Sequence, residues 1–248
     1  MAYTPIDITT PDGVCDSYIA YPDSGGPFPA VILYMDAVGI RPVLQRMAER
    51  IAANGYYVLM PNLFYRQGRA QPGESAEVLK PENRPKLIER VQALTPDAVS
   101  RDAGVYLKFI ASQKNVKSGS KVGLTGYCMG GGVALRTAEA YPDRVAAAAS
   151  FHGGNLATEA PDSPHRLVGQ VKGELYFGHA DQDRIMPPED IARLDGALQA
   201  AKVRYESELY QGALHGYTMP DLPAYNKAAE DRHWERLLAL FQRTLNPV

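Results

Sequence analysis

The six-residue segment Gly126-Tyr-Cys-Met-Gly-Gly131 constrains the fold of this chain more than any other feature. It follows a short predicted strand at 121–125 and leads directly into a predicted helix at 129–141. A strand that turns sharply into a helix forces the residue at the turn into a strained conformation, and side chains two positions away would clash. The flanking glycines therefore predict a strand–turn–helix unit with Cys128 at its apex.

A cysteine at such a turn is a candidate nucleophile. It would lie at a helix N-terminus, where the helix dipole and free N–H groups favour a thiolate. Serine is the commoner residue in this G-x-nucleophile-x-G pattern. The structural alternative is a buried, inert cysteine beside a tight helix–strand contact. A dinucleotide site is a weaker interpretation, because the sequence G-x-G-x-x-G is absent here.

The rest of the chain alternates between strand-like and helix-like segments, which predicts an α/β fold with a mostly parallel sheet and helices on both faces. Segments 3–10 and 14–21 flank Pro11-Asp12-Gly13 and predict an antiparallel hairpin. Further strands are expected at 30–35, 56–60, 121–125, 145–151, 174–178 and 203–210, and helices at 42–53, 83–94, 97–113, 129–141, 188–201 and 222–243. Residues 61–82 are expected to form a long surface excursion. Without repeats or linker composition, we expect one domain over residues 1–248.

Composition excludes several classes of protein. Hydrophobic residues make up 45% of the 248 residues, which is enough for a sizeable core. The net charge is −2 without a basic run, so we expect no nucleic-acid partner. No segment approaches the roughly 20 apolar residues of a membrane span, and the N-terminus does not resemble a signal peptide. Two cysteines, Cys15 and Cys128, form no disulfide framework, and we expect a reduced, cytoplasmic protein.

An acid and a histidine follow Cys128 in the order that a catalytic triad takes in this kind of fold. Two aspartates after the strand at 174–178 compete for the acid, and the spacing to Pro187 favours Asp183 over Asp181. His215 follows the strand at 203–210 and is the candidate base. The alternatives are a solvated loop around Asp183 and a metal site, although no second His/Cys cluster is present to complete the latter.

These three residues predict cleavage of small esters by acyl transfer through a thioester. The tetrahedral oxyanion would accept hydrogen bonds from the backbone N–H groups of Met129 and Ala37. We also expect Tyr127, His152 and Tyr217 to contact the substrate.

Four segments together resemble the dienelactone hydrolase family, and the likeness extends over nearly the whole chain. They are Gly55-Tyr-Tyr-Val-Leu-Met-Pro-Asn-Leu-Phe64, Gly126-Tyr-Cys-Met-Gly-Gly131, Asp183–Pro187 and Ala213-Leu-His-Gly-Tyr217. The resemblance implies an α/β-hydrolase fold and hydrolysis of an enol-lactone or similar small ester, with no cofactor and no metal. We expect a monomer or small homo-oligomer with a small-molecule substrate. A ligand-binding protein and a cysteine redox protein on the same fold are the alternatives.

Two positions depart from the family pattern. The family glutamate that helps to activate the cysteine is replaced by Asp36, one methylene shorter. We expect Asp36 to contribute to activation, and the alternative is that it caps its loop or pairs with Arg41. The family arginine four residues after the histidine is replaced by Met219. Arg66, Arg69 and Arg84 are candidates for binding a substrate carboxylate in its place.

Overall fold

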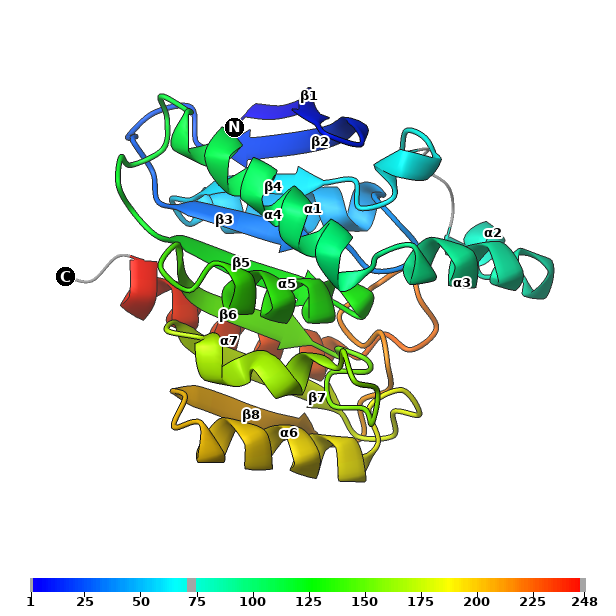
Figure 1. Cartoon of the computed structure of the whole chain (residues 1–248). Helices are drawn as coiled ribbons and strands as arrows, with labels where there is room; N and C mark the ends of the chain where they lie inside the picture. Colours follow the sequence, from blue (N-terminus) through cyan, green and yellow to red (C-terminus); the bar gives the residue numbers. More distant parts are fainter. Residues whose placement is uncertain (1, 71–74, 246–248) are drawn as a thin grey trace.

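An eight-stranded sheet with the order β1-β2-β4-β3-β5-β6-β7-β8 organises the protein. The computed structural model describes residues 2–70 and 75–245 (Figure 1). The strands are β1 (Ala2–Thr10), β2 (Gly13–Tyr21), β3 (Ala30–Tyr34), β4 (Tyr57–Pro61), β5 (Val122–Tyr127), β6 (Val145–Phe151), β7 (Glu174–Ala180) and β8 (Tyr205–Tyr210). β1 and β2 form the expected antiparallel hairpin, β2 pairs antiparallel with β4, and the pairs from β4 to β8 are parallel.

Helices cover both faces of the sheet, as the alternating pattern predicts. The helices α1 (Pro42–Ala53) and α7 (Lys227–Leu245) lie behind the sheet in Figure 1. The helices α4 (Pro96–Ala111), α5 (Met129–Ala140) and α6 (Pro188–Ala200) lie in front of it. The predicted α/β architecture is therefore confirmed.

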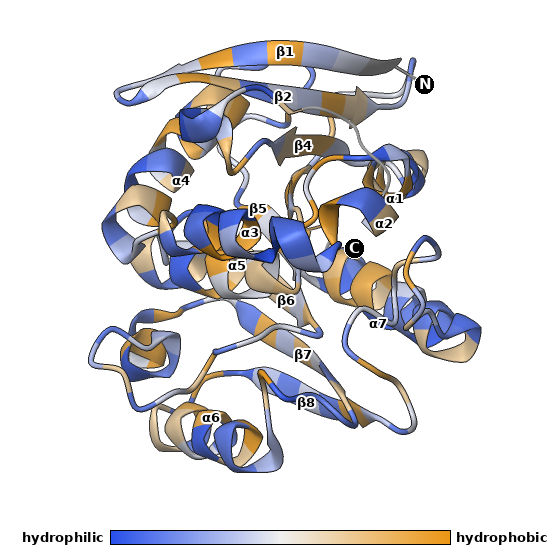
Figure 2. Cartoon of the chain, turned by 90° about the vertical axis from the view of Figure 1, so that its right-hand side faces the viewer, coloured by the Kyte–Doolittle hydropathy of each residue, from blue (hydrophilic) through white to orange (hydrophobic). Residues whose placement is uncertain are grey.

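The central strands are buried along their whole length, which explains their continuous apolar sequence. Every residue of β3, β4 and β5 is buried. Their parallel neighbours run in the same direction, so the loops after β3, β5 and β7 leave the sheet at one common edge. Figure 2 looks onto this edge. The residues singled out after each of these strands are thereby brought to one side of the molecule.

Two segments differ from expectation. The last helix begins at Lys227 rather than at 222, because residues 216–226 form successive turns and the Asn226 side chain accepts the N–H of Ala229 at 3.1 Å, which caps the helix. The excursion at 61–82 contains the short helical segments η1 (Tyr65–Gln67), α2 (Ser75–Val78) and η2 (Pro81–Asn83), followed by α3 (Arg84–Gln92). Residues 71–74 of the excursion lie outside the described residues. No helix within 2–70 and 75–245 is long and apolar enough to cross a membrane.

The acidic side chain of Glu139 is buried, and the charge of Arg136 offsets only part of the effect of burial. Glu139 on α5 is 2% exposed, and neither carboxylate oxygen has a hydrogen-bond partner among the described residues. Burial raises the pKa of Glu139 to about 8, against an ordinary value of 4.5. The folded protein therefore holds this proton over a pH range in which the unfolded chain releases it.

This imbalance predicts that the free energy of unfolding falls as pH rises from about 4.5 to 8, by roughly 3–5 kcal/mol for Glu139 alone. The substitution Glu139→Gln removes this dependence and makes the protein more stable than the wild type at pH 8. Denaturant titrations at pH 5 and pH 8 measure the difference, with Glu89→Gln on the exposed surface of α3 as the control. Equal pH dependence in wild type and Glu139→Gln would contradict the assignment.

Candidate active site

The predicted strand–turn–helix unit is present, and its apex is one residue long. β5 ends at Tyr127, α5 begins at Met129, and Cys128 between them has φ 55° and ψ −120°. Its N–H donates to the carbonyl oxygen of Phe151 at 3.1 Å. Positive φ is unfavourable for a residue with a side chain, so the surrounding structure must hold Cys128 in place. The thiol is partly exposed.

The two glycines of the pattern are required by close backbone contacts. A Cβ on Gly126 would lie 1.9 Å from the carbonyl oxygen of Gly130. A Cβ on Gly130 would lie 2.5 Å from the carbonyl oxygens of both Tyr34 and Met35, at the end of β3. No side chain fits at either position without moving backbone, so α5 can approach β3 and β5 this closely only with glycine there.

His215 and Asp183, 32 residues apart in sequence, form a short hydrogen bond. The Nδ1 atom of His215 lies 2.6 Å from Oδ2 of Asp183, whose Oδ1 accepts the N–H of Ile185 at 3.0 Å. The Asp183 side chain is 2% exposed and the His215 ring 27% exposed. Asp181, the competing aspartate, accepts the N–H of Gly212 instead. Among the two aspartates considered from the sequence, Asp183 is the partner of the histidine.

The His215 side chain also interacts with the nucleophile candidate, Cys128. Nε2 is buried and has no hydrogen-bond partner among the described residues. Burial lowers the pKa of His215, but the hydrogen bond to Asp183 and the interaction with Cys128 outweigh burial and raise the pKa to about 10. The ring therefore interacts with a carboxylate and with a sulfur, as the base of a nucleophile–base–acid unit is required to do.

Asp36 forms a buried ion pair with Arg41, which is the alternative considered from the sequence. The guanidinium donates to both carboxylate oxygens, at 2.7 and 2.9 Å, and its Nε donates to Asp221 at 2.6 Å. Asp36 also accepts the N–H of Val38 at 3.0 Å, which closes the loop after β3. Burial lowers the pKa of Arg41, but the two carboxylates outweigh it and raise the pKa above its ordinary value.

Two residues expected to contact substrate lie behind the site instead. The Tyr127 side chain is fully buried, and its hydroxyl lies 2.9 Å from Nε2 of His233 on α7. Tyr217 is also fully buried, and its hydroxyl donates to the carbonyl of Gly178. Both rings lie in the core, so they pack beneath the site and do not contact substrate. His152 does border the site: its ring centre lies 5.1 Å from that of His215, and Nε2 bonds Thr218 at 2.8 Å.

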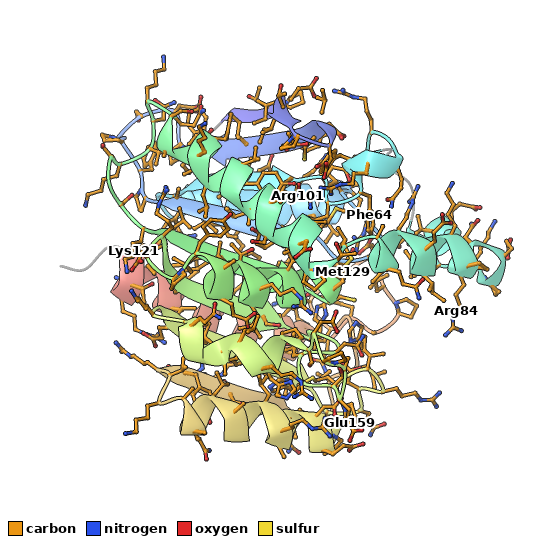
Figure 3. The ribbon with its side chains drawn as sticks, viewed as in Figure 1. Phe64, Arg84, Arg101, Lys121, Met129 and Glu159 are labelled. Atoms are coloured by element: carbon orange, nitrogen blue, oxygen red, sulfur yellow. The ribbon has the colours of Figure 1, made fainter. Side chains whose placement is uncertain are left out.

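Two cavities meet at Cys128. Cavity A, of about 490 Å³, extends beneath α3 and along α5, and cavity B, of about 450 Å³, extends along the loops at 36–38 and 214–224. Cys128, Ala37 and Leu87 border both. Met129, which is labelled at the start of α5 in Figure 3, borders cavity A, whereas His215 borders cavity B. The two expected oxyanion donors, Ala37 and Met129, are thus both beside the nucleophile candidate.

None of the three arginines proposed from the sequence borders these cavities. Arg66 pairs with Asp12 and Asp102, and Arg69 pairs with Asp7. Arg84 is exposed on α3 and extends away from the body of the protein (Figure 3). Arg136, which borders cavity A, was missed. Its place in the sequence could have indicated this, because Arg136 follows Met129 by seven residues and both therefore lie on the same face of α5.

Metal ligands are not grouped in the described part of the chain: no cluster of three or more His, Cys, Asp or Glu side chains is placed to hold an ion.

The sequence profile of the dienelactone hydrolase family matches residues 15–245. A carboxymethylenebutenolidase of Rhodococcus opacus is 28% identical over 87% of this chain and 81% of its own length. A candidate carboxymethylenebutenolidase of a Synechocystis strain is 29% identical over 92% of this chain and 91% of its own length. Both relatives are therefore similar to this chain over most of both sequences.

Solved structures are also similar along nearly the whole chain. A candidate dienelactone hydrolase of Klebsiella pneumoniae has a TM-score of 0.86 at 22% identity, covering 98% of both chains. A dienelactone hydrolase-like promiscuous phosphotriesterase from metagenomic libraries has a TM-score of 0.80 at 24% identity, covering 99% of this chain and 100% of the other. These similarities show that the fold is the α/β-hydrolase fold.

The geometry of the His215 ring predicts how its titration responds to substitution. Asp183→Asn removes the anionic partner of Nδ1, so the pKa of His215 should fall from about 10 by roughly 1–3 units. Asp181→Asn should leave it unchanged. The measurement is a pH titration of the His215 ring by NMR in both variants and the wild type. A larger fall in Asp181→Asn would show that Asp183 is not the partner in solution.

Proposed function

This chain belongs to the dienelactone hydrolase family, and on that premise we propose that it hydrolyses small carboxylic esters or lactones with Cys128 as the nucleophile. His215 is the base and Asp183 the acid that orients it. The observation that carries the proposal is the two-sided environment of His215, which bonds Asp183 through Nδ1 and interacts with Cys128. A protein that only binds a ligand has no need for a thiol on a strained backbone, followed in contact order by an imidazole and a carboxylate.

The reaction begins with attack of the Cys128 sulfur on the ester carbonyl. His215 takes the proton of the thiol and, as an imidazolium, balances the charge on the sulfur, while Asp183 holds the ring in the required orientation. As the carbonyl oxygen becomes an oxyanion, it accepts hydrogen bonds from the proposed donors, the N–H groups of Ala37 and Met129, because both residues border cavity A together with Cys128. The alcohol leaves with a proton from His215, and a thioester to Cys128 remains. Water then gives a proton to His215 and attacks the thioester, which releases the acid and the sulfur.

Asp36 is the second contributor that we propose for activation of Cys128. It borders cavity B together with Cys128, so this residue lies beside the space where substrate would bind. Both of its oxygens are engaged by Arg41, so Asp36 would have to release a guanidinium hydrogen bond to accept a proton. The same ion pair holds the loop that carries Ala37, and a purely structural role is the competing explanation.

The second cysteine favours a hydrolase over a redox protein. Cys15 is fully buried in β2, and its sulfur lies 3.4 Å from both the Ser17 hydroxyl and the carbonyl oxygen of Asn62. Burial raises the pKa of its thiol, which keeps it in the unreactive neutral form. Cys15 is therefore poorly suited to resolve an oxidised Cys128.

Removing the nucleophile should abolish ester hydrolysis. We expect Cys128→Ala to lower kcat by on the order of 10³ to 10⁶ while the protein stays folded. A panel of p-nitrophenyl esters and lactones measures the loss, circular dichroism checks the fold, and Cys15→Ala is the matched control. Undiminished hydrolysis by folded Cys128→Ala would refute the proposed mechanism.

The role of Asp36 is tested by Asp36→Asn. If the carboxylate acts on the nucleophile, removal of its negative charge should shift the alkylation of Cys128 to lower pH and reduce turnover at the same time. Iodoacetamide labelling rates across pH, together with kcat, give both readouts. An unshifted labelling profile with normal turnover would leave Asp36 with only the loop-holding role.

A further inference from the structure

Two separate cavities open onto one nucleophile. On the premise of the hydrolase mechanism above, we propose that the substrate is an uncharged, acyclic ester with an apolar group on each side of the ester linkage. The acyl group occupies cavity A and the alcohol group occupies cavity B. Ile88, Val91 and Val133 make the wall of cavity A apolar, and Leu214 and Leu222 do the same in cavity B.

The position of His215 sets the direction in which the ester lies. The leaving oxygen must take its proton from Nε2, so the alcohol lies on the side of His215. His215 borders cavity B and not cavity A. The bond from sulfur to the carbonyl carbon forms as the bond from that carbon to the alcohol oxygen breaks, and the alcohol departs through cavity B. The acyl group stays in cavity A on Cys128 until water, entering from the His215 side, releases it as the acid.

The size of the cavities favours an acyclic substrate. At about 490 and 450 Å³, each lies within the range that holds a drug-sized ligand. A small lactone joins its acyl and alcohol groups in one ring, which leaves much of both cavities unfilled. Two separate chains on either side of the carbonyl bury apolar surface in both.

The charges around the cavities favour an uncharged substrate. Within the described ranges, Arg136 is the only lysine or arginine that borders either cavity, and its Nη2 donates to the carbonyl of Asp162 at 2.6 Å. No lysine or arginine among the described residues borders cavity B, and Asp36 on its wall is already paired with Arg41. A substrate carboxylate would lose its hydration in cavity B without gaining a cation there, and in cavity A it would have to compete with the carbonyl of Asp162 for the guanidinium of Arg136.

Substitutions that fill one cavity at a time test whether the acyl group occupies cavity A and the alcohol group occupies cavity B. Gly132 borders cavity A, and a Cβ on it would meet only Leu156, at 3.8 Å, so Gly132→Leu fills the cavity without displacing backbone. Ala224→Leu narrows cavity B. Gly196→Leu on the exposed side of α6, where nothing lies within 4 Å of an added Cβ, is the matched control. Two ratios of kcat/KM are measured: p-nitrophenyl hexanoate over acetate for acyl length, and hexyl over methyl butyrate for alcohol length.

We expect Gly132→Leu to lower the acyl ratio at least about tenfold and to keep the alcohol ratio within about twofold, with the reverse result for Ala224→Leu. Gly196→Leu should change neither ratio. Equal effects on both ratios, or the opposite pattern, would overturn the assignment of the two cavities while Cys128-dependent hydrolysis persists. Hydrolysis that survives Cys128→Ala would instead refute Cys128 as the nucleophile, the part of the proposed function on which this inference rests.

The charge preference has its own test. Monomethyl succinate and methyl butyrate share the alcohol and have acyl groups of the same chain length, but only the succinate carries a carboxylate. We expect kcat/KM for the succinate to be lower by at least about tenfold. Equal values would show that a cation of the protein accepts the carboxylate and would overturn the proposal of an uncharged substrate. Arg136→Met would then be the first variant to test for that cation.

Discussion

The contact of three backbone segments at the end of the sheet is the constraint on which the site depends. Gly126 in β5 and Gly130 in α5 allow α5 to approach the ends of β5 and β3 within distances that no Cβ permits. This contact fixes the positive φ of Cys128 and brings the loop after β3, with Ala37, to the same place. The proposed nucleophile and the proposed oxyanion donors thus share one structural origin. A side chain at position 130 would separate them even if every reacting residue were kept.

Local patterns predicted the elements and the ordered set of Cys128, Asp183 and His215, because each depends on a few neighbouring residues. The strand β6 has the bounds expected from its apolar run. The direction of the Tyr127 side chain was not readable, since β5 is buried on both faces and its sequence does not alternate. The start of α7 was placed too early, because residues 222–226 are compatible with a helix and only the cap at Asn226 reveals where it begins.

Contacts between distant segments could not be predicted. Arg41 and Asp36 are five residues apart, and their pairing was a foreseeable alternative, but Asp221 is 180 residues from Arg41. No spacing rule connects them. The reason for the contact is physical: a guanidinium that is 1% exposed is tolerated only when anionic partners surround it. Through this cluster the loop after β3 is joined to the loop after His215, and cavity B lies between them.

Helix α3 covers cavity A and touches the hydrophobic core through the partly buried Val91. None of its residues is fully buried, and Ile88 is 46% exposed, although Leu87 and Val91 border the cavity. Few apolar contacts give a segment a low free energy of local opening, so its amide hydrogens should exchange early. An occupant of cavity A adds the contacts that the helix lacks. Ligand occupancy and the helical order of this segment are therefore linked equilibria, in which each stabilises the other.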